Sequence, residues 1–219
     1  MSRFAHTLAL LAAGAAAGAA AQPISLTASL TNAQEGSSVI PTTVAGAPRP
    51  ASFGTASFLI DAAHTSMTFS ATVFNIDFTG SQTADTNDNL VAAHIHAGPT
   101  AVPGSTAGVV WGFFGTPFND NNPNDRTITP FATGVGGTIT GKWDAPEGNN
   151  TTFAAQLNNI LSGLSYINFH TSQFPSGEVR GQILQVAAVP EPETAALLVA
   201  GLGLLGAWTR RARTSTSAT

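Results

Sequence analysis

Tyr166-Ile-Asn-Phe-His-Thr-Ser-Gln-Phe-Pro-Ser-Gly-Glu-Val-Arg-Gly-Gln-Ile183 is the stretch that decides the fold of this chain. Polar and apolar residues alternate on both sides of its central Ser-Gln-Phe-Pro-Ser-Gly segment, which predicts two β-strands joined by a turn. If His170 pairs with Glu178, the two strands share one continuous polar face. That face would carry Tyr166, Asn168 and His170 from the first strand and Glu178, Arg180 and Gln182 from the second.

The same alternation recurs along most of the chain. Ala56–Ile60 and Ser66–Phe74, separated by Asp61–Thr65, predict an antiparallel hairpin. The segments between the expected strands, such as Pro117–Pro130, are rich in turn-forming residues. Further strands are expected at Ile24–Leu30, Leu90–His96, Gly108–Phe114, Gly137–Trp143, Leu164–His170 and Glu178–Val186.

One segment has the period of a helix, and it predicts a short helix over about residues 152–162. Asn150 or Thr151 can cap its start, and Gly163 can end it. Its apolar residues recur at helical spacing: Phe153, Leu157, Ile160 and Leu161. We therefore expect an all-β fold, an antiparallel Greek-key-like β-sandwich or barrel with one short helix.

Composition limits the kinds of partner. Residues 22–188 carry four basic and ten acidic side chains, a formal net charge near −6. This balance argues against nucleic acid or an anionic membrane surface as a partner. The 219 residues include no cysteine, so stability must come from the packed core or from a bound metal and not from disulfides.

The first residues have the pattern of a secretory signal. Arg3 gives a positive start, Leu8–Ala20 is apolar, and Ala19 and Ala21 are the small residues that signal peptidase requires before Gln22. We expect residues 1–21 to be a helical signal peptide that is removed on export. The alternative is a buried N-terminal helix, but the run is nearly all Ala, Leu and Gly and has no polar face.

The last residues have three parts in a fixed order: Val189-Pro-Glu-Pro-Glu193, the uncharged run Thr194–Trp208, and then Arg210, Arg211 and Arg213. The two prolines keep the first part extended and accessible. As a helix the run would reach roughly 22 Å, which is short for a hydrocarbon core of about 30 Å. The arginines would stay on the cytoplasmic side of the membrane.

This tail resembles the PEP-CTERM sorting signal of exported bacterial proteins, with Pro190, Glu191 and Pro192 as the signature tripeptide. The resemblance implies that residues 189–213 insert transiently into the membrane as a transmembrane helix and are removed by an exosortase. Residues 214–219 would be a short remaining tail. The alternative is a permanent membrane anchor preceded by a proline-rich linker.

Histidines form the main candidate site. In Ala93-His-Ile-His-Ala-Gly-Pro99, positions 94 and 96 of a strand point to the same face, so two imidazoles lie side by side. With His170 from another strand, His94 and His96 could hold zinc or copper. The alternative is a hydrogen-bonded network that fixes loops to strands, with Glu178 and Arg180 as a structural ion pair.

Three motifs together resemble the CHRD domain, a family named after chordin. They are the histidine pair, Leu161-Ser-Gly-Leu-Ser-Tyr-Ile-Asn-Phe-His-Thr171 and Pro175-Ser-Gly-Glu-Val-Arg-Gly-Gln-Ile183. The likeness extends over about Ile24–Leu184, within a domain expected at residues 22–188. It implies an all-β sandwich or barrel, and it implies no established catalytic activity. The chain departs from the family pattern in the long, asparagine-rich loop Phe114–Phe131.

No other motif indicates catalysis. The sequence has no G-x-S-x-G nucleophile elbow, no cysteine, and only half of a calcium loop at Asp85-x-Asn87-x-Asn89. We therefore expect an exported, exosortase-processed protein of the cell surface or extracellular matrix, with a non-enzymatic binding or structural domain and no cofactor. The expected partners are signal peptidase, exosortase and extracellular polysaccharide or matrix protein. The alternative is a metal-binding protein or metalloenzyme that uses the three histidines.

Overall fold

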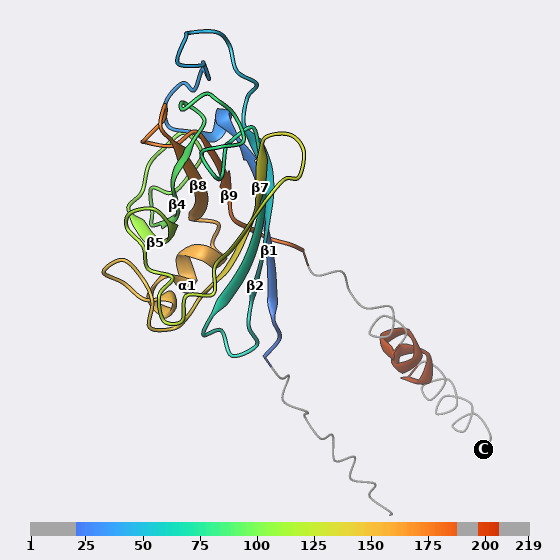
Figure 1. The fold of residues 1–219 in the computed structure, drawn as a ribbon. Helices are drawn as coiled ribbons and strands as arrows, with labels where there is room; N and C mark the ends of the chain where they lie inside the picture. The colour runs from blue at the N-terminus through green and yellow to red at the C-terminus, as the bar shows by residue number, and fades with distance from the viewer. Residues whose placement is uncertain (1–20, 188–196, 206–219) are drawn as a thin grey trace, which may run out of the picture. The chain divides into compact units, whose positions relative to one another are not determined.

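A computed structural model describes residues 21–187 and 197–205 of the chain (Figure 1). The chain divides into two compact units, Met1–Leu184 and Gln185–Thr219. In the second unit residues 197–205 are helical. None of the described helices combines the length and hydrophobicity needed to cross a membrane.

The expected signal peptide and most of the expected sorting signal lie outside the described residues. This applies to Ala19, Pro190, Glu191, Pro192, Arg210, Arg211 and Arg213, and to both ends of the run predicted to form a transmembrane helix. Ala21 is described and exposed.

The first unit is built almost entirely of β-strands. Its helical parts are a 3-10 turn, η1 (Asn32–Gln34), and one α-helix, α1 (Phe153–Leu161). The strands are β1 (Ile24–Thr31), β2 (Phe53–Ile60), β3 (Met67–Phe74), β4 (Leu90–Ala97), β5 (Val109–Phe114), β6 (Thr127–Pro130), β7 (Gly136–Trp143), β8 (Ser165–Thr171), β9 (Val179–Gln182) and β10 (Leu184–Gln185).

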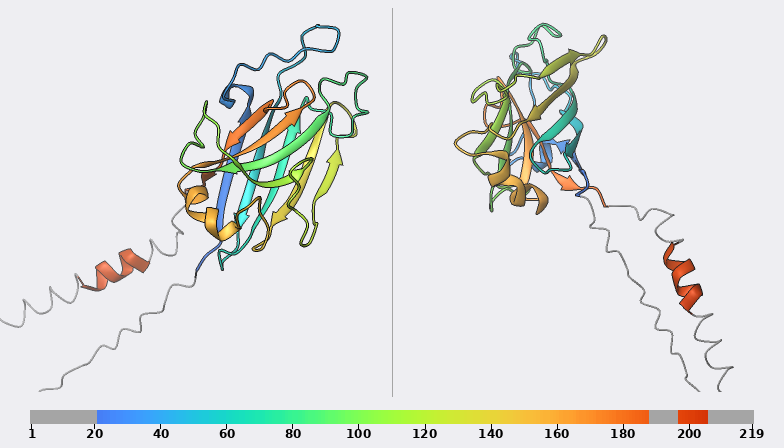
Figure 2. Two further views of the ribbon diagram at one scale, coloured as in Figure 1. Left: turned by 90° about the vertical axis from the view of Figure 1, so that its left-hand side faces the viewer. Right: turned by 90° about the horizontal axis from the view of Figure 1, so that it is seen from below.

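These strands form one strongly curled sheet, a half-barrel. The order is β5-β4-β8-β9-β1-β2-β3-β7-β6, every neighbouring pair along this path is antiparallel, and β10 pairs with β1. Figures 1 and 2 show β4, β5 and β8 facing β1, β2 and β7 across the interior. The antiparallel all-β prediction is confirmed. A sandwich of two separate sheets is not what forms, because Thr31 of β1 pairs with Arg180 of β9 and joins the two halves.

The predicted β2–β3 hairpin is confirmed and continues into β1. The three strands pair without a bulge, from Ile24 opposite Ile60 to Phe53 opposite Phe74. Alternate residues face inward, and Leu26, Ala28 and Leu30 of β1 are almost fully buried. Since side chains alternate between faces with a period of two, the other residues of these strands lie on the outer face of the sheet.

Aromatic side chains fill the space between the two halves. Trp111 of β5 and Trp143 of β7 are fully buried and stacked, with ring centroids 5.7 Å apart. Phe69 of β3 meets the edge of Trp111 at 5.7 Å. Fully burying one such side chain contributes about 2–3 kcal/mol, so this contact between distant strands keeps the sheet curled.

Two strands differ from the prediction. The strand expected at Glu178–Val186 is divided into β9 and β10, and β6 lies inside a segment predicted to consist of turns. β6 is only four residues long, lies at the end of the strand order and finishes at Pro130. A proline is tolerated at such an edge because its missing N–H is not needed there, and the sequence pattern therefore resembles a loop.

The predicted helix is confirmed, with a different cap. Thr152 precedes α1, and its hydroxyl accepts the N–H of Ala155 at 3.3 Å. Phe153 and Ile160 of α1 are fully buried, and Phe153 meets Trp143 edge-on at 5.4 Å. The helix therefore covers the lower end of the core in the view of Figure 1.

Candidate metal centre

The three candidate histidines come together on the outer face of neighbouring strands. Register pairs His94 of β4 with Asn168 of β8, and His96 with Tyr166, while His170 lies two positions further along β8. One ligand atom from each histidine lies within 4.8 Å of the other two. All three side chains are buried, because loops cover this part of the face.

The outward nitrogen of each imidazole faces a backbone carbonyl. The distances are 3.1 Å from His94 Nε2 to the oxygen of Thr116, 2.9 Å from His96 Nδ1 to that of Ala107, and 3.0 Å from His170 Nδ1 to that of Pro175. A carbonyl oxygen can only accept, so each of these nitrogens carries the proton. In a neutral imidazole the second nitrogen is then a bare lone pair.

The second nitrogens, which carry these lone pairs, are His94 Nδ1, His96 Nε2 and His170 Nε2. His94 Nδ1 lies 3.1 Å from His170 Nε2, and His96 Nε2 is buried without a hydrogen-bond partner among the described residues. Burial lowers the pKa of all three histidines, that of His96 to about 4 and that of His170 to about 3. Neutral rings at physiological pH therefore leave three acceptors facing one another with no donor between them.

A metal ion fits this arrangement. Two nitrogens bound to zinc at 2.0–2.1 Å with tetrahedral angles lie roughly 3.3 Å apart, which is close to the separation between His94 and His170. Histidines that bind metals commonly donate their other ring N–H to a carbonyl, which fixes tautomer and orientation. All three rings are already held in this way.

Tyr166 and Arg180 support the centre from one side. The Tyr166 ring stacks on His96 with centroids 4.6 Å apart, and the Arg180 guanidinium lies 3.7 Å from the Tyr166 centroid. Arg180 also donates to the carbonyls of Val102 and Ser105. Its partners are therefore an aromatic ring and a loop, and the expected ion pair between Arg180 and Glu178 is not formed.

Asn168 and Gln182 complete the polar face, in the register predicted from the sequence: Asn168 opposite Arg180 and Tyr166 opposite Gln182. The Gln182 amide nitrogen donates to the carbonyls of Ala101 and Gly163, which holds two loops to β9.

Glu35 is a site residue that sequence reasoning missed. Asn168 Nδ2 donates to Glu35 Oε1 at 2.8 Å. Burial raises the pKa of Glu35 to about 7, although Arg180 and the Asn168 hydrogen bond act in the opposite direction. Glu35 is 133 residues from Asn168 in the chain. The one signal in the sequence was an acidic side chain in an otherwise mainly uncharged loop.

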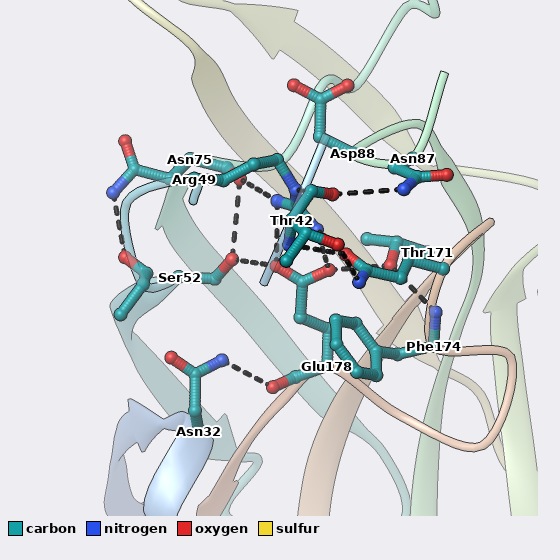
Figure 3. A network of polar contacts seen from close by, with 12 residues as sticks. Asn32, Thr42, Arg49, Ser52, Asn75, Asn87, Asp88, Thr171, Phe174 and Glu178 are labelled. Carbon is teal, nitrogen blue, oxygen red and sulfur yellow. Dashed lines mark hydrogen bonds and ion pairs between the residues drawn. The ribbon is translucent and has the colours of Figure 1, made fainter. Parts of the chain in front are cut away.

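Glu178 belongs to a separate buried network, shown in Figure 3. Arg49 pairs with its carboxylate at 2.8 and 3.1 Å, and the hydroxyls of Ser52 and Thr171 donate to it. Glu178 has no exposed surface, and the Arg49 side chain is 5% exposed. This network fastens the long loop after η1 to the start of β9, and sequence analysis missed Arg49 as its cation.

The half calcium loop does not form a metal site of this kind. The Oδ1 atom of Asp85 accepts the backbone N–H groups of Val44 and Asn87. Among the described residues, only the three histidines bring together ligand atoms from three or more His, Asp or Glu side chains.

Comparison with known families gives two matches. The CHRD domain model matches residues 26–183, and the model of the PEP-CTERM protein-sorting motif matches residues 188–213. No curated protein and no solved structure matches the chain.

Proposed function

This chain belongs to the CHRD domain family and ends in a PEP-CTERM motif, and on that premise we propose that it is a surface or extracellular-matrix protein whose domain binds one transition-metal ion. The motif indicates sorting to the cell surface by an exosortase. Signal peptidase would remove residues 1–21, exosortase would process residues 189–213, and residues 22–188 would act outside the membrane as a non-enzymatic module.

One observation carries the metal proposal: three buried imidazoles turn bare nitrogens toward the same space while their N–H groups are held by carbonyls. Imidazole is a good ligand for zinc and copper. The two ions are therefore the candidates, with His94, His96 and His170 as ligands.

A structural role for the ion follows from where the carbonyls come from. Ala107, Thr116 and Pro175 lie in three different loops, and each accepts from a different histidine. An ion at the centre would hold both strands and, through the rings, all three loops. A chain without cysteine has no disulfide that could do this.

A metalloenzyme is the second candidate, because three protein ligands leave the fourth position of a tetrahedral ion open, as in catalytic zinc sites. The two roles can be separated with cobalt as a spectroscopic probe. Azide should change the visible spectrum of the cobalt-loaded protein if an exogenous ligand reaches the ion, and should leave it unchanged if the site is closed.

The proposal is tested by titrating the chelator-treated protein with zinc and copper in a calorimeter. We expect one ion per chain, a higher melting temperature when it is bound, and loss of both effects in His96→Gln. His64→Gln is the matched control, because the His64 ring bonds the carbonyl of Gln22 and lies outside the cluster. The absence of metal uptake, or equal uptake by His96→Gln, would refute the metal proposal.

The sorting proposal has its own test, which uses the motif Pro190-Glu191-Pro192. In cells that contain an exosortase, we expect a shortened form of the protein outside the cell and retention of the full-length form in a Glu191→Ala variant. If the wild-type protein also stays at full length in the membrane, the tail is an anchor and not a processed signal.

A further inference from the structure

A second, exposed region lies on the outer face of the same sheet, over β1, β2, β3, β7 and β6. Side chains at matched positions of five neighbouring strands form two rows of hydroxyl groups. One row is Ser29, Thr55, Thr72, Thr138 and Thr129, and the other is Thr27, Ser57, Ser70, Thr140 and Thr127. All ten residues are exposed or partly exposed. At about 4.8 Å between strands, each row spans roughly 19 Å.

A row of phenylalanines runs beside the hydroxyl rows. Phe53 of β2 lies opposite Phe74 of β3, and their rings stack with centroids 4.8 Å apart and planes 8° apart. Phe131 lies 4.9 Å beyond Phe74. Phe53 is 50% exposed and Phe74 38% exposed. Stacked rings with this much exposed surface present a fixed apolar platform to a ligand.

A hollow of about 750 Å³ adjoins this platform. Phe53 lines the hollow, whereas Phe74, which stacks on one face of the Phe53 ring, does not. The other residues that line the hollow include small side chains with hydroxyl, amide or carboxyl groups: Thr31, Asn32, Glu35, Ser37 and Ser38.

The chemical groups on this surface indicate which class of ligand it can bind. Neither hydroxyl row contains a charged residue, and Glu35 is the one ionisable side chain that lines the hollow. Of the residues that interfaces with proteins favour, Phe53 lines the hollow, whereas Tyr, Trp, Met and Arg are missing from both rows and from the hollow lining. A sugar ring has apolar C–H faces, which can pack on an aromatic ring. Its hydroxyl groups can form hydrogen bonds with the surrounding hydroxyl and amide groups.

We propose that this surface binds a neutral polysaccharide, with one sugar ring stacked on the free face of Phe53 in the hollow. The rest of the chain would run over the outer face of β1, β2 and β3, where the hydroxyl rows can donate to and accept from its hydroxyl groups. Binding should therefore strengthen with chain length, from disaccharide to hexasaccharide. The proposal goes beyond metal binding and does not depend on it, since none of the three histidines lines the hollow. Glu35 lines the hollow while accepting a hydrogen bond from Asn168 on the polar face of β8.

Calorimetry of the purified full chain tests the proposal, with hexasaccharides of glucan, mannan, xylan and galactan as neutral probes and an alginate hexamer as the anionic probe. We expect binding of at least one neutral hexamer, with affinity reduced at least tenfold in Phe53→Ala and kept in Phe53→Tyr. Val44→Ala is the control, because Val44 is 67% exposed in a loop and lies outside the hollow and both hydroxyl rows. It should bind as the wild type does.

Three results would overturn the proposal: no binding of any neutral hexamer, binding of alginate alone, or equal affinity in Phe53→Ala and wild type. Melting curves of each variant show whether a loss of binding reflects unfolding, and Phe53→Tyr keeps the ring in place. The titrations are repeated with EDTA. Sugar binding that persists there while metal is removed separates this site from the metal centre.

Discussion

Glu178 lies at a position with no solvent exposure, where a carboxylate is stable only if donors surround it. Arg49 supplies the opposite charge, and Ser52 and Thr171 supply hydroxyl donors. Because all these donors are needed at once, the effects of single residues at this site should be large.

We predict that Arg49→Met lowers the free energy of unfolding by about 3–5 kcal/mol, because it leaves the Glu178 carboxylate buried and unpaired. Urea denaturation at pH 7 measures this loss. Lys142→Met is the control, since Lys142 and its partner Asp144 form a more exposed pair, and such pairs contribute at most about 1 kcal/mol. Equal losses in the two variants would show that the Glu178 network does not stabilise the fold.

Glu35 gives a pH-dependent prediction. Its pKa in the folded protein is raised from 4.5 to about 7, so between these values the folded chain holds a proton that the unfolded chain has released. Glu35 therefore lowers stability as pH rises from 4.5 to 7. Glu35→Gln, which keeps an acceptor for Asn168, removes this loss.

The stability of Glu35→Gln minus that of wild type should be about 1 kcal/mol larger at pH 8 than at pH 5. This free energy is discounted because Glu35 is partly exposed. Denaturant melts of both proteins at the two pH values measure the difference. A stability difference between variant and wild type that does not change with pH would contradict the assignment.

At the scale of elements, β5 shows how a strand makes room for the loop beside the histidine cluster. A Cβ atom on Gly112 would lie 1.9 Å from the carbonyl oxygen of Pro117 and 3.0 Å from the His94 ring. The loop that contains Thr116, the acceptor for His94, can therefore pass over β5 only where the strand has no side chain.

We predict that Gly112→Ala lowers the free energy of unfolding by about 2 kcal/mol and weakens metal binding at least tenfold, because the loop must move away from His94. Gly108→Ala is the matched control: it lies just before β5, and nothing approaches its Cβ position within 4 Å. Thermal melts and metal titrations of both variants measure the effects. Unchanged metal affinity in Gly112→Ala would mean that the Thr116 carbonyl does not orient His94.

The elements that could be predicted from sequence are those with strong local patterns. The alternation in β1, β2 and β3 follows directly from one buried and one exposed face. The same pattern on β8 and β9 also predicted the register that pairs Asn168 with Arg180.

Other features depend on contacts between residues far apart in the chain. The pairing of Thr31 with Arg180 joins the two halves into one sheet, and the pairing of Arg49 with Glu178 spans 129 positions. No local pattern encodes either pair. Arg180 was predicted to bond its neighbour Glu178 because sequence proximity was the available guide, whereas the folded loops offered each residue other partners.

At the scale of the whole molecule, the outer face of one curled sheet differs between its two halves. Over β4, β8 and β9 it is covered by loops and holds the histidines, and over β1, β2 and β3 it is open and lined with hydroxyl groups. The curl is what allows both, because it places the apolar core on the inner face and leaves the outer face free for polar residues.

Metal binding is the central claim, and X-ray absorption spectroscopy of the purified protein loaded with zinc or copper tests it most directly. The arrangement of His94, His96 and His170 predicts one ion per chain with three imidazole nitrogens at about 2.0–2.1 Å, reduced to two in His96→Gln. A protein that retains no ion after loading, or an ion surrounded by oxygen ligands alone, would contradict the claim.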